Sequence, residues 1–202
     1  MKLYITPGSP YARMARILIL EKGLENRVEI IAARTRAADS PYYRINPSGR
    51  VPYLVSDDGI GLEESALICD RLDRLDGRPI LDTPTGELAW QARRLEALAR
   101  SLLDGLAVWS REILRPASEQ SPTVIQHELN RSRRMTGLWE SEIAHPVMRG
   151  SLNMSQLTLA CALGLEARIP DFRWRPEHPR LRGWFDSISA RPSFIATAPP
   201  AA

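Results

Sequence analysis

The hydrophobic pattern of this chain changes its period near residue 80, and this change constrains the fold more than any other feature. Residues 1–77 alternate between short apolar runs and amphipathic stretches, which indicates strands and helices in turn. Residues 78–85, RPILDTPT, contain two prolines and indicate a linker. Beyond the linker, apolar residues recur at helical spacing. The sequence therefore predicts an α/β domain over residues 1–78 and an all-α domain over residues 86–202.

The first domain has a recognisable order of elements. Ser9-Pro10 opens its first helix, since serine is a good N-cap and proline suits the first helical position, and Gly23 ends that helix. Four strands are expected, over residues 2–6, 28–31, 51–55 and 60–62, and a second helix over residues 65–75. The order strand-helix-strand, irregular link, hairpin, helix predicts a thioredoxin-like fold, in which a parallel pair of strands joins an antiparallel pair.

The second domain is expected to contain helices over residues 87–114, 123–144, 153–167 and 180–190. Asn153 precedes Gln156 by three residues, a spacing that predicts a capping box at the start of the third of these helices. The last seven residues, ATAPPAA, are expected to be frayed.

Composition excludes several classes of protein. The formal net charge is +3, but the basic residues are scattered among acidic ones without aromatic interleaving, which argues against nucleic-acid binding. No apolar run approaches the roughly 20 residues that cross a bilayer, and the N-terminus lacks the apolar core of a secretory signal. We therefore expect a cytoplasmic protein without membrane or nucleic-acid partners. Cys69, Cys161 and the three histidines share no metal-ligand spacing, so no metal site is expected.

Three segments of the first domain carry the most informative residues. They read S-P-Y-A-R-M-A-R-I from residue 9, N-P-S-G-R-V-P-Y-L from residue 46 and L-E-E-S-A-L-I from residue 62. Together with H-P-R-L-R-G-W-F-D-S-I-S-A-R-P-S-F from residue 178, they resemble the cytosolic glutathione transferase family, in order and spacing, over essentially the whole chain. With a serine at the start of its first helix, the chain resembles the bacterial members of this family. One departure is N-M-S-Q from residue 153, where the family's core helix often begins S-x-A-D.

The resemblance implies a set of glutathione-binding residues. A cis bond between Val51 and Pro52 would turn the backbone of Val51 toward an extended peptide ligand, which it could pair like an added strand. Ser65 and the amides of its helix would bind the γ-glutamyl carboxylate, Glu64 the ammonium group, and Arg50 the glycyl carboxylate. Simpler roles stay open for the same residues: a proline that blocks an edge strand, a helix cap with an acidic neighbour and an exposed arginine.

Ser9 is the predicted catalytic residue. Related redox folds carry C-x-x-C at this junction, whereas S-P-Y-A excludes a dithiol exchange here. The Ser9 hydroxyl could donate to the glutathione sulfur and favour the thiolate over the thiol, whose free pKa is about 8.5. Two alternatives stay open, namely that Ser9 is only an N-cap and that the hydroxyl of Tyr4 or Tyr11 is the donor.

The predicted function is that of a detoxifying glutathione transferase. Glutathione would be the co-substrate, without a metal, and its thiolate would attack a small hydrophobic electrophile or a peroxide. The second domain would line the electrophile pocket, with Tyr11, Leu106 and Trp109 as candidates. The helical spacing of Leu102, Leu106 and Trp109 fits plain core packing equally well.

Two other functions are considered for this sequence, and a homodimer is expected. A non-catalytic ligand-binding or scaffold protein of the same fold is the main alternative. A thiol-disulfide reductase is disfavoured because positions 9 and 12 hold no cysteine. The resemblance also implies a homodimer, with the helices over residues 65–75 and 87–114 near the two-fold axis.

Overall fold

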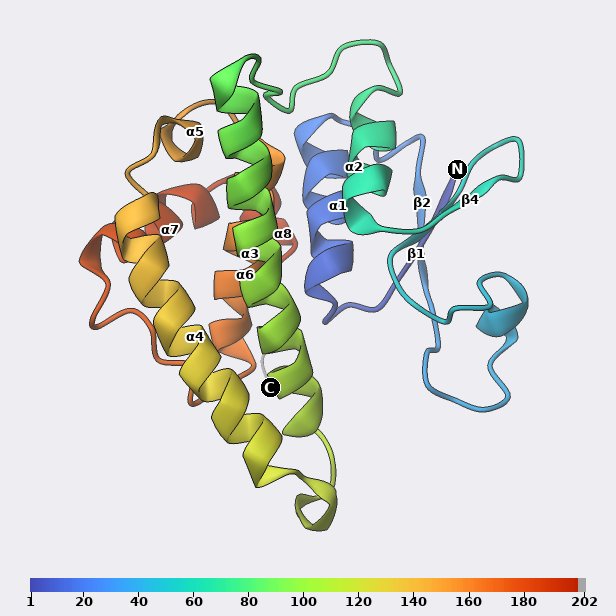
Figure 1. The fold of residues 1–202 in the computed structure, drawn as a ribbon. Helices are drawn as coiled ribbons and strands as arrows, with labels where there is room; N and C mark the ends of the chain where they lie inside the picture. Colours follow the sequence, from blue (N-terminus) through green and yellow to red (C-terminus); the bar gives the residue numbers. More distant parts are fainter. Residues whose placement is uncertain (200–202) are drawn as a thin grey trace. The chain divides into compact units, whose positions relative to one another are not determined.

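A computed structural model describes residues 1–199 of the chain and shows two compact units (Figure 1). The first unit is Met1–Ile80, and the second begins at Leu81. Among the described residues, no helix combines the length and the apolar character that a membrane span requires.

The first unit is built on a mixed sheet of four strands in the order β2-β1-β3-β4. The strands are β1 (Lys2–Ile5), β2 (Glu29–Ala32), β3 (Tyr53–Val55) and β4 (Gly61–Leu62). β1 runs parallel to β2 and antiparallel to β3, and β3 runs antiparallel to β4. This is the predicted thioredoxin-like sheet. β3 begins two residues later than predicted, because Pro52 has no N–H to donate to a ladder.

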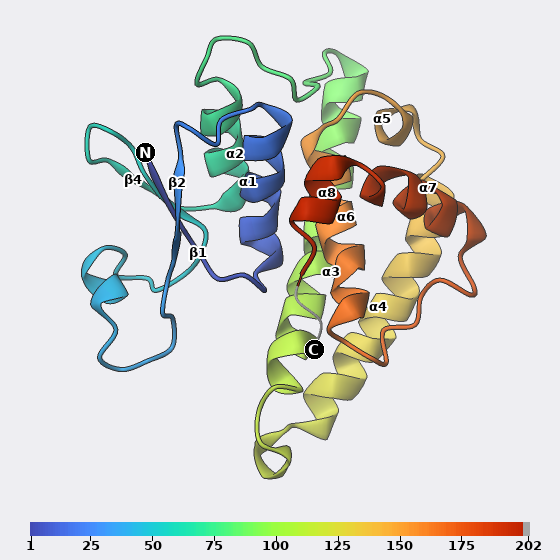
Figure 2. The same ribbon diagram turned by 180° about the vertical axis from the view of Figure 1, so that it is seen from behind.

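Two helices cover one face of this sheet, α1 (Pro10–Glu21) and α2 (Ser65–Asp73), and they pack against each other (Figures 1 and 2). The apolar face of α1 is buried, including Met14, Ile17 and Leu18. Gly23 follows the helix with a φ of 62°, which glycine adopts without a steric penalty. The amide of Leu24 donates to the carbonyl of Ile19, which closes α1 in a Schellman motif.

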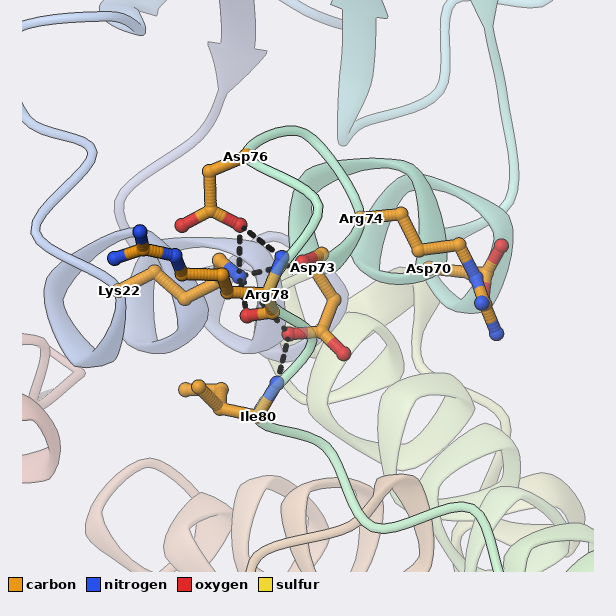
Figure 3. Close-up of polar contacts among 7 residues, drawn as sticks. All are labelled: Lys22, Asp70, Asp73, Arg74, Asp76, Arg78 and Ile80. Atoms are coloured by element: carbon orange, nitrogen blue, oxygen red, sulfur yellow. Dashed lines mark hydrogen bonds and ion pairs between the residues drawn. The ribbon is translucent and has the colours of Figure 1, made fainter.

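A buried lysine fastens the end of α1 to the chain that follows α2 (Figure 3). The Lys22 ammonium donates to the Asp73 carbonyl (2.5 Å), to Oδ1 of Asp76 (2.9 Å) and to the Arg78 carbonyl (2.7 Å). Oδ1 of Asp73 lies 3.5 Å from the ammonium and accepts from the Ile80 amide at 2.8 Å. The side chains of Lys22 and Asp73 are only 1% and 5% exposed. We call these five residues the Lys22 clamp. The hydrogen bond from Lys22 also lowers the pKa of Asp76.

The second unit is helical, as predicted. Its helices are α3 (Glu87–Glu112), α4 (Pro122–Glu142), α5 (Pro146–Arg149), α6 (Met154–Leu163), α7 (Pro179–Ser189) and α8 (Pro192–Ala196). α3 packs against both α4 and α6, and α7 packs against α4 and α6 (Figure 2). Every residue of α6 from 155 to 163 is buried, so this helix forms the centre of the unit.

The predicted capping box at the start of α6 is confirmed. The Gln156 amide donates to Oδ1 of Asn153 at 3.1 Å, and the Asn153 amide donates to Oε1 of Gln156 at 3.2 Å. The Asn153 side chain also donates to the Val147 carbonyl at 2.8 Å. These bonds satisfy the N-terminal amides of a helix whose start is buried away from water.

The structure adds single-turn elements that the sequence pattern does not reveal. α5 and α8 have four and five residues, too few to show a helical period, and short 3₁₀ turns form at Pro41–Arg44, Ala117–Glu119 and Gly164–Ala167. The helix that was expected over residues 153–167 ends at Leu163 as α6, and the 3₁₀ turn Gly164–Ala167 forms the rest of that range.

The C-terminal end of the described chain is more ordered than predicted. Ala196 ends α8, and Thr197 is 2% exposed and donates to the Ser193 carbonyl at 2.7 Å. The expectation of fraying is therefore wrong for these two residues. For residues 200–202, the expectation falls outside the described residues.

A carboxylate from α4 caps the start of α7. Glu140 accepts from the amides of Arg180 (3.0 Å) and Leu181 (2.9 Å), the first residues of α7 after its proline. Burial by itself would raise the pKa of Glu140, but the two amide hydrogen bonds and Arg180 lower it overall. α7 thus obtains its cap from another helix, since its own N-cap residue, His178, makes no side-chain cap.

Candidate functional site

Strand register brings the three segments singled out in the sequence to one edge of the sheet. Tyr4, near the end of β1, lies opposite Tyr53, the first residue of β3. Leu62, the last residue of β4, lies opposite Leu54. The end of β1, the start of β3 and the end of β4 therefore share an edge. From this edge the chain enters α1 at residue 9, β3 at residues 50–52 and α2 at residues 64–65.

Ser9 is the N-cap of α1. Its Oγ accepts from the Ala12 amide at 3.2 Å, and its backbone is extended, with φ −77° and ψ 118°. A hydroxyl carries one donor hydrogen and two acceptor lone pairs, so the cap uses a lone pair and leaves the hydrogen for another acceptor. The cap and the predicted activating role are therefore compatible in the same side chain.

The two rival tyrosines occupy different surroundings. Tyr4 lies on β1, half-buried, and its ring packs against that of Tyr42 with centroids 5.6 Å apart. Tyr11 is half-buried in the first turn of α1, two residues after Ser9. Of these hydroxyl-bearing residues, Ser9 is the one that caps α1, where the positive end of the helix dipole favours an anion.

The segment that leads into β3 is held through the Arg50 carbonyl. This carbonyl accepts from the Tyr42 hydroxyl at 2.5 Å and from Nδ2 of Asn46 at 3.0 Å. The Val51–Pro52 bond is cis, as the resemblance implied, and Pro52 is buried. The Arg50 side chain is exposed.

Glu64 and Ser65 form the start of α2. Oε1 of Glu64 accepts from the Ala66 amide at 3.3 Å and from the Ser65 hydroxyl at 3.2 Å, while Ser65 is 2% exposed. Glu64 has a φ of 70°, a left-handed conformation that few residues other than glycine adopt. Backbone strain of this kind concentrates at binding sites, where it aims neighbouring groups.

Glu63 belongs to this edge too, although it was absent from the predicted site. Its Oε1 accepts from Nδ2 of Asn46 at 2.7 Å and from the Ser48 hydroxyl. Asn46 is 2% exposed, and its Oδ1 accepts from the Ser48 amide at 3.1 Å. The sequence shows Glu63 and Glu64 as two adjacent acidic residues before a helix. It does not show that the side chain of Glu63 accepts hydrogen bonds from Asn46 and Ser48.

The pocket candidates of the second unit lie in its core. Leu102, Leu106 and Trp109 on α3 are each 1% exposed, and the Trp109 ring meets that of Phe172 edge-on at 6.4 Å. This burial fits the core-packing alternative. Within residues 1–199, no group of three or more histidine, cysteine, aspartate or glutamate side chains is arranged to hold a metal ion.

Comparison with known proteins identifies the family. The family described as "Glutathione S-transferase, N-terminal domain" matches residues 3–80. "Uncharacterized GST-like protein YibF" from Escherichia coli K12 is 29% identical over 204 residues, which cover 100% of both chains.

Two solved structures are similar over the full length. A glutathione transferase family member from Pseudomonas fluorescens Pf-5, with bound S-(propanoic acid)-glutathione, is 34% identical, with a TM-score of 0.85 and 100% of both chains covered. A glutathione S-transferase from Methylobacillus flagellatus KT with bound glutathione is 30% identical, with a TM-score of 0.85, over 98% of this chain and 99% of that one. Because sequence and fold agree from end to end, this chain belongs to the glutathione transferase family.

Proposed function

We propose that this protein is a glutathione transferase that ionises the thiol of bound glutathione for attack on a small hydrophobic electrophile or a peroxide. The observation that carries the proposal is the convergence of Ser9, residues 50–52 and residues 64–65 on one edge of the sheet. Relatives at 34% and 30% identity hold a glutathione derivative and glutathione, which supports the same ligand here.

We assign glutathione binding to the first unit. Val51 would pair through its backbone with the cysteinyl main chain of the ligand, as an added strand does. The γ-glutamyl carboxylate would meet the start of α2, where the Ser65 hydroxyl can turn from Glu64 to the ligand. Glu64 would then accept from the ligand's ammonium group, and Arg50 would meet the glycyl carboxylate.

Ser9 would activate the thiol. Its hydroxyl hydrogen is not used by the cap of α1, so it can donate to the glutathione sulfur, and the positive end of α1 would add to the effect. Lowering the thiol pKa by about two units corresponds to roughly 2.7 kcal/mol in favour of the thiolate. The nucleophile belongs to glutathione, and Ser9 tunes it.

We assign electrophile specificity to the helical unit. Leu106 and Trp109 are buried in its core, so they would support the electrophile pocket rather than touch the electrophile. Tyr11 of the first unit stays a candidate because it lies two residues after Ser9 in the chain. We further propose a cytoplasmic enzyme. Both cysteines are buried as reduced thiols, as suits a reducing compartment.

Calorimetric titration of glutathione into the protein tests the proposal. We expect binding together with a rise in the melting temperature, because a ligand that binds only the folded state must stabilise it. Turnover of chlorodinitrobenzene separates the transferase from the scaffold alternative. Binding without turnover of either this electrophile or a peroxide would favour a ligand-binding protein. Absence of glutathione binding would contradict the proposed transferase and favour the scaffold alternative.

We also propose a homodimer in which α2 and α3 lie near the two-fold axis. Leu67 on α2 and Trp90 on α3 are large apolar side chains with exposed fractions of 50% and 62%. Sedimentation over a range of concentrations should give about twice the monomer mass of 22.7 kDa. Trp90→Glu should shift the equilibrium toward monomer, and a monomeric wild-type protein at all concentrations would contradict the proposal.

A further inference from the structure

The peptide group between Arg50 and Val51 is fixed from one side. Its carbonyl accepts from both the Tyr42 hydroxyl and Nδ2 of Asn46. A trans peptide is planar, so its N–H points opposite to its carbonyl. Fixing the Arg50 carbonyl therefore fixes the direction of the Val51 N–H. Among the described residues, this N–H makes no hydrogen bond within the protein.

Asn46 can hold this carbonyl only if its own amide group is held. Its Nδ2 donates to the Arg50 carbonyl at 3.0 Å and to Oε1 of Glu63 at 2.7 Å, with a longer contact to the Tyr42 hydroxyl oxygen at 3.4 Å, and its Oδ1 accepts from the Ser48 amide. A carboxylate and a carbonyl accept but never donate, so these partners leave one orientation for the Asn46 amide. Without Glu63, the Nδ2 group of this buried side chain would lose its nearest acceptor, which is also the charged one.

Glu63 also joins two parts of the site. Oε1 of Glu63 accepts from Asn46 and from the Ser48 hydroxyl, and Oγ of Ser48 accepts in turn from the Arg50 amide at 3.2 Å. The residue after Glu63 is Glu64, the N-cap of α2. One carboxylate thus links the turn before Val51 to the start of the helix that carries Ser65. A hydrogen bond to a charged acceptor is stronger than one between neutral groups.

We propose that Glu63 is a positioning residue for the glutathione site: through Asn46 and Ser48 it holds the Arg50 carbonyl, so that the Val51 N–H faces the ligand. This role rests on the proposed glutathione-binding function. Glu63 itself need not touch glutathione, and it takes no part in ionising the thiol. Its loss should therefore weaken glutathione binding without slowing the chemical step.

The test compares the wild-type protein with Glu63→Ala and Glu63→Gln in calorimetry and steady-state kinetics. Glu63→Ala should raise the Kd and KM for glutathione about tenfold, the effect of one lost hydrogen bond to a charged group. The kcat at saturating glutathione should change less than about twofold, because the interaction is equal in ground and transition states. Glu63→Gln keeps an acceptor oxygen and should restore the KM to within about threefold of the wild-type value.

Two further variants make the outcome decisive. Glu25→Ala removes another exposed carboxylate from the same unit and should leave the KM unchanged. If Glu63→Ala does not fold, Ser48→Ala removes the other donor to the same oxygen and should raise the KM by a smaller factor, with kcat unchanged. Equal affinity of the wild type and the folded Glu63→Ala protein would overturn the role of Glu63 alone. Absence of glutathione binding by the wild type would overturn the proposed function as well.

Discussion

Replacing Ser9 by alanine is expected to lower kcat/KM for chlorodinitrobenzene roughly 25-fold at neutral pH, while the Kd for glutathione rises by about fivefold or less. The hydroxyl is proposed to donate to the thiolate, and a hydrogen bond to a charged group contributes roughly 1.5–3 kcal/mol. Because the free thiol is mostly protonated at neutral pH, losing this bond removes most of the nucleophile. Ser9→Thr keeps a hydroxyl and should retain more activity than Ser9→Ala.

The chain offers a matched control for the capping role of Ser9. Ser121 precedes Pro122 at the start of α4, and its Oγ accepts from the Val124 amide at 3.3 Å, in the same arrangement as Ser9, Pro10 and Ala12. Ser9→Ala and Ser121→Ala should each lower the free energy of unfolding by about 1 kcal/mol, but only the first should lose activity. If Ser9→Ala keeps half or more of the wild-type kcat/KM, Ser9 is only a cap, and Tyr4 or Tyr11 becomes the candidate donor.

The Lys22→Ala variant is expected to lose about 3–5 kcal/mol of unfolding free energy, a large part of the stability of a typical domain. The substitution removes an ammonium group whose side chain is 1% exposed and which lies 3.5 Å from Oδ1 of Asp73, a side chain that is itself 5% exposed. It also leaves the Asp73 and Arg78 carbonyls without their donor. Equilibrium unfolding in urea, followed by a probe in the first unit, measures the effect.

Two comparisons separate the Lys22 clamp from a general effect of charge. Lys2, the other lysine of the chain, is exposed on β1, and Lys2→Ala should change the free energy of unfolding by less than about 0.5 kcal/mol. Adding Asp73→Asn to Lys22→Ala should restore about 1 kcal/mol or more, because it removes a buried negative charge that has lost the lysine ammonium, while an oxygen remains for the Ile80 amide. A loss below about 1 kcal/mol for Lys22→Ala would contradict the energetic role given to the clamp.

Most of the fold could be predicted from local patterns. The change of period near residue 80, the Ser9-Pro10 start of α1 and the glycine after it are local signals, and the structure confirms them. The capping box of Asn153 and Gln156 also depends on a three-residue spacing alone. α5 and α8 were missed because one turn is too short to show a period.

The residues of the candidate site were found through motifs, but the contacts that hold them were not. Asn46 and Glu63 are 17 residues apart, and their hydrogen bond forms only because β3 and β4 pair. The sequence shows Glu63 as one of two acidic residues before a helix, without any sign of its partner. The positive φ of Glu64 is likewise a property of the folded backbone rather than of the residue type.

Long-range polar contacts escaped prediction for the same reason. In the sequence, Lys22 is simply the residue before the helix-ending Gly23, whereas its partners lie more than 50 residues along the chain. Glu140 meets the start of α7 across 40 residues. From sequence alone, a charged residue is expected to be exposed to solvent. Only the folded structure shows which charged side chains are buried and paired.

The pKa of the glutathione thiol, measured while it is bound to this protein, tests the central claim most directly. The ultraviolet absorbance of the thiolate, followed against pH in the saturated complex, gives this value. We predict a pKa of about 6.5 in the wild-type complex and about 8.5 in the Ser9→Ala complex, the latter being that of a free thiol. A wild-type complex whose thiol titrates at about 8.5 would contradict the proposed activation of glutathione.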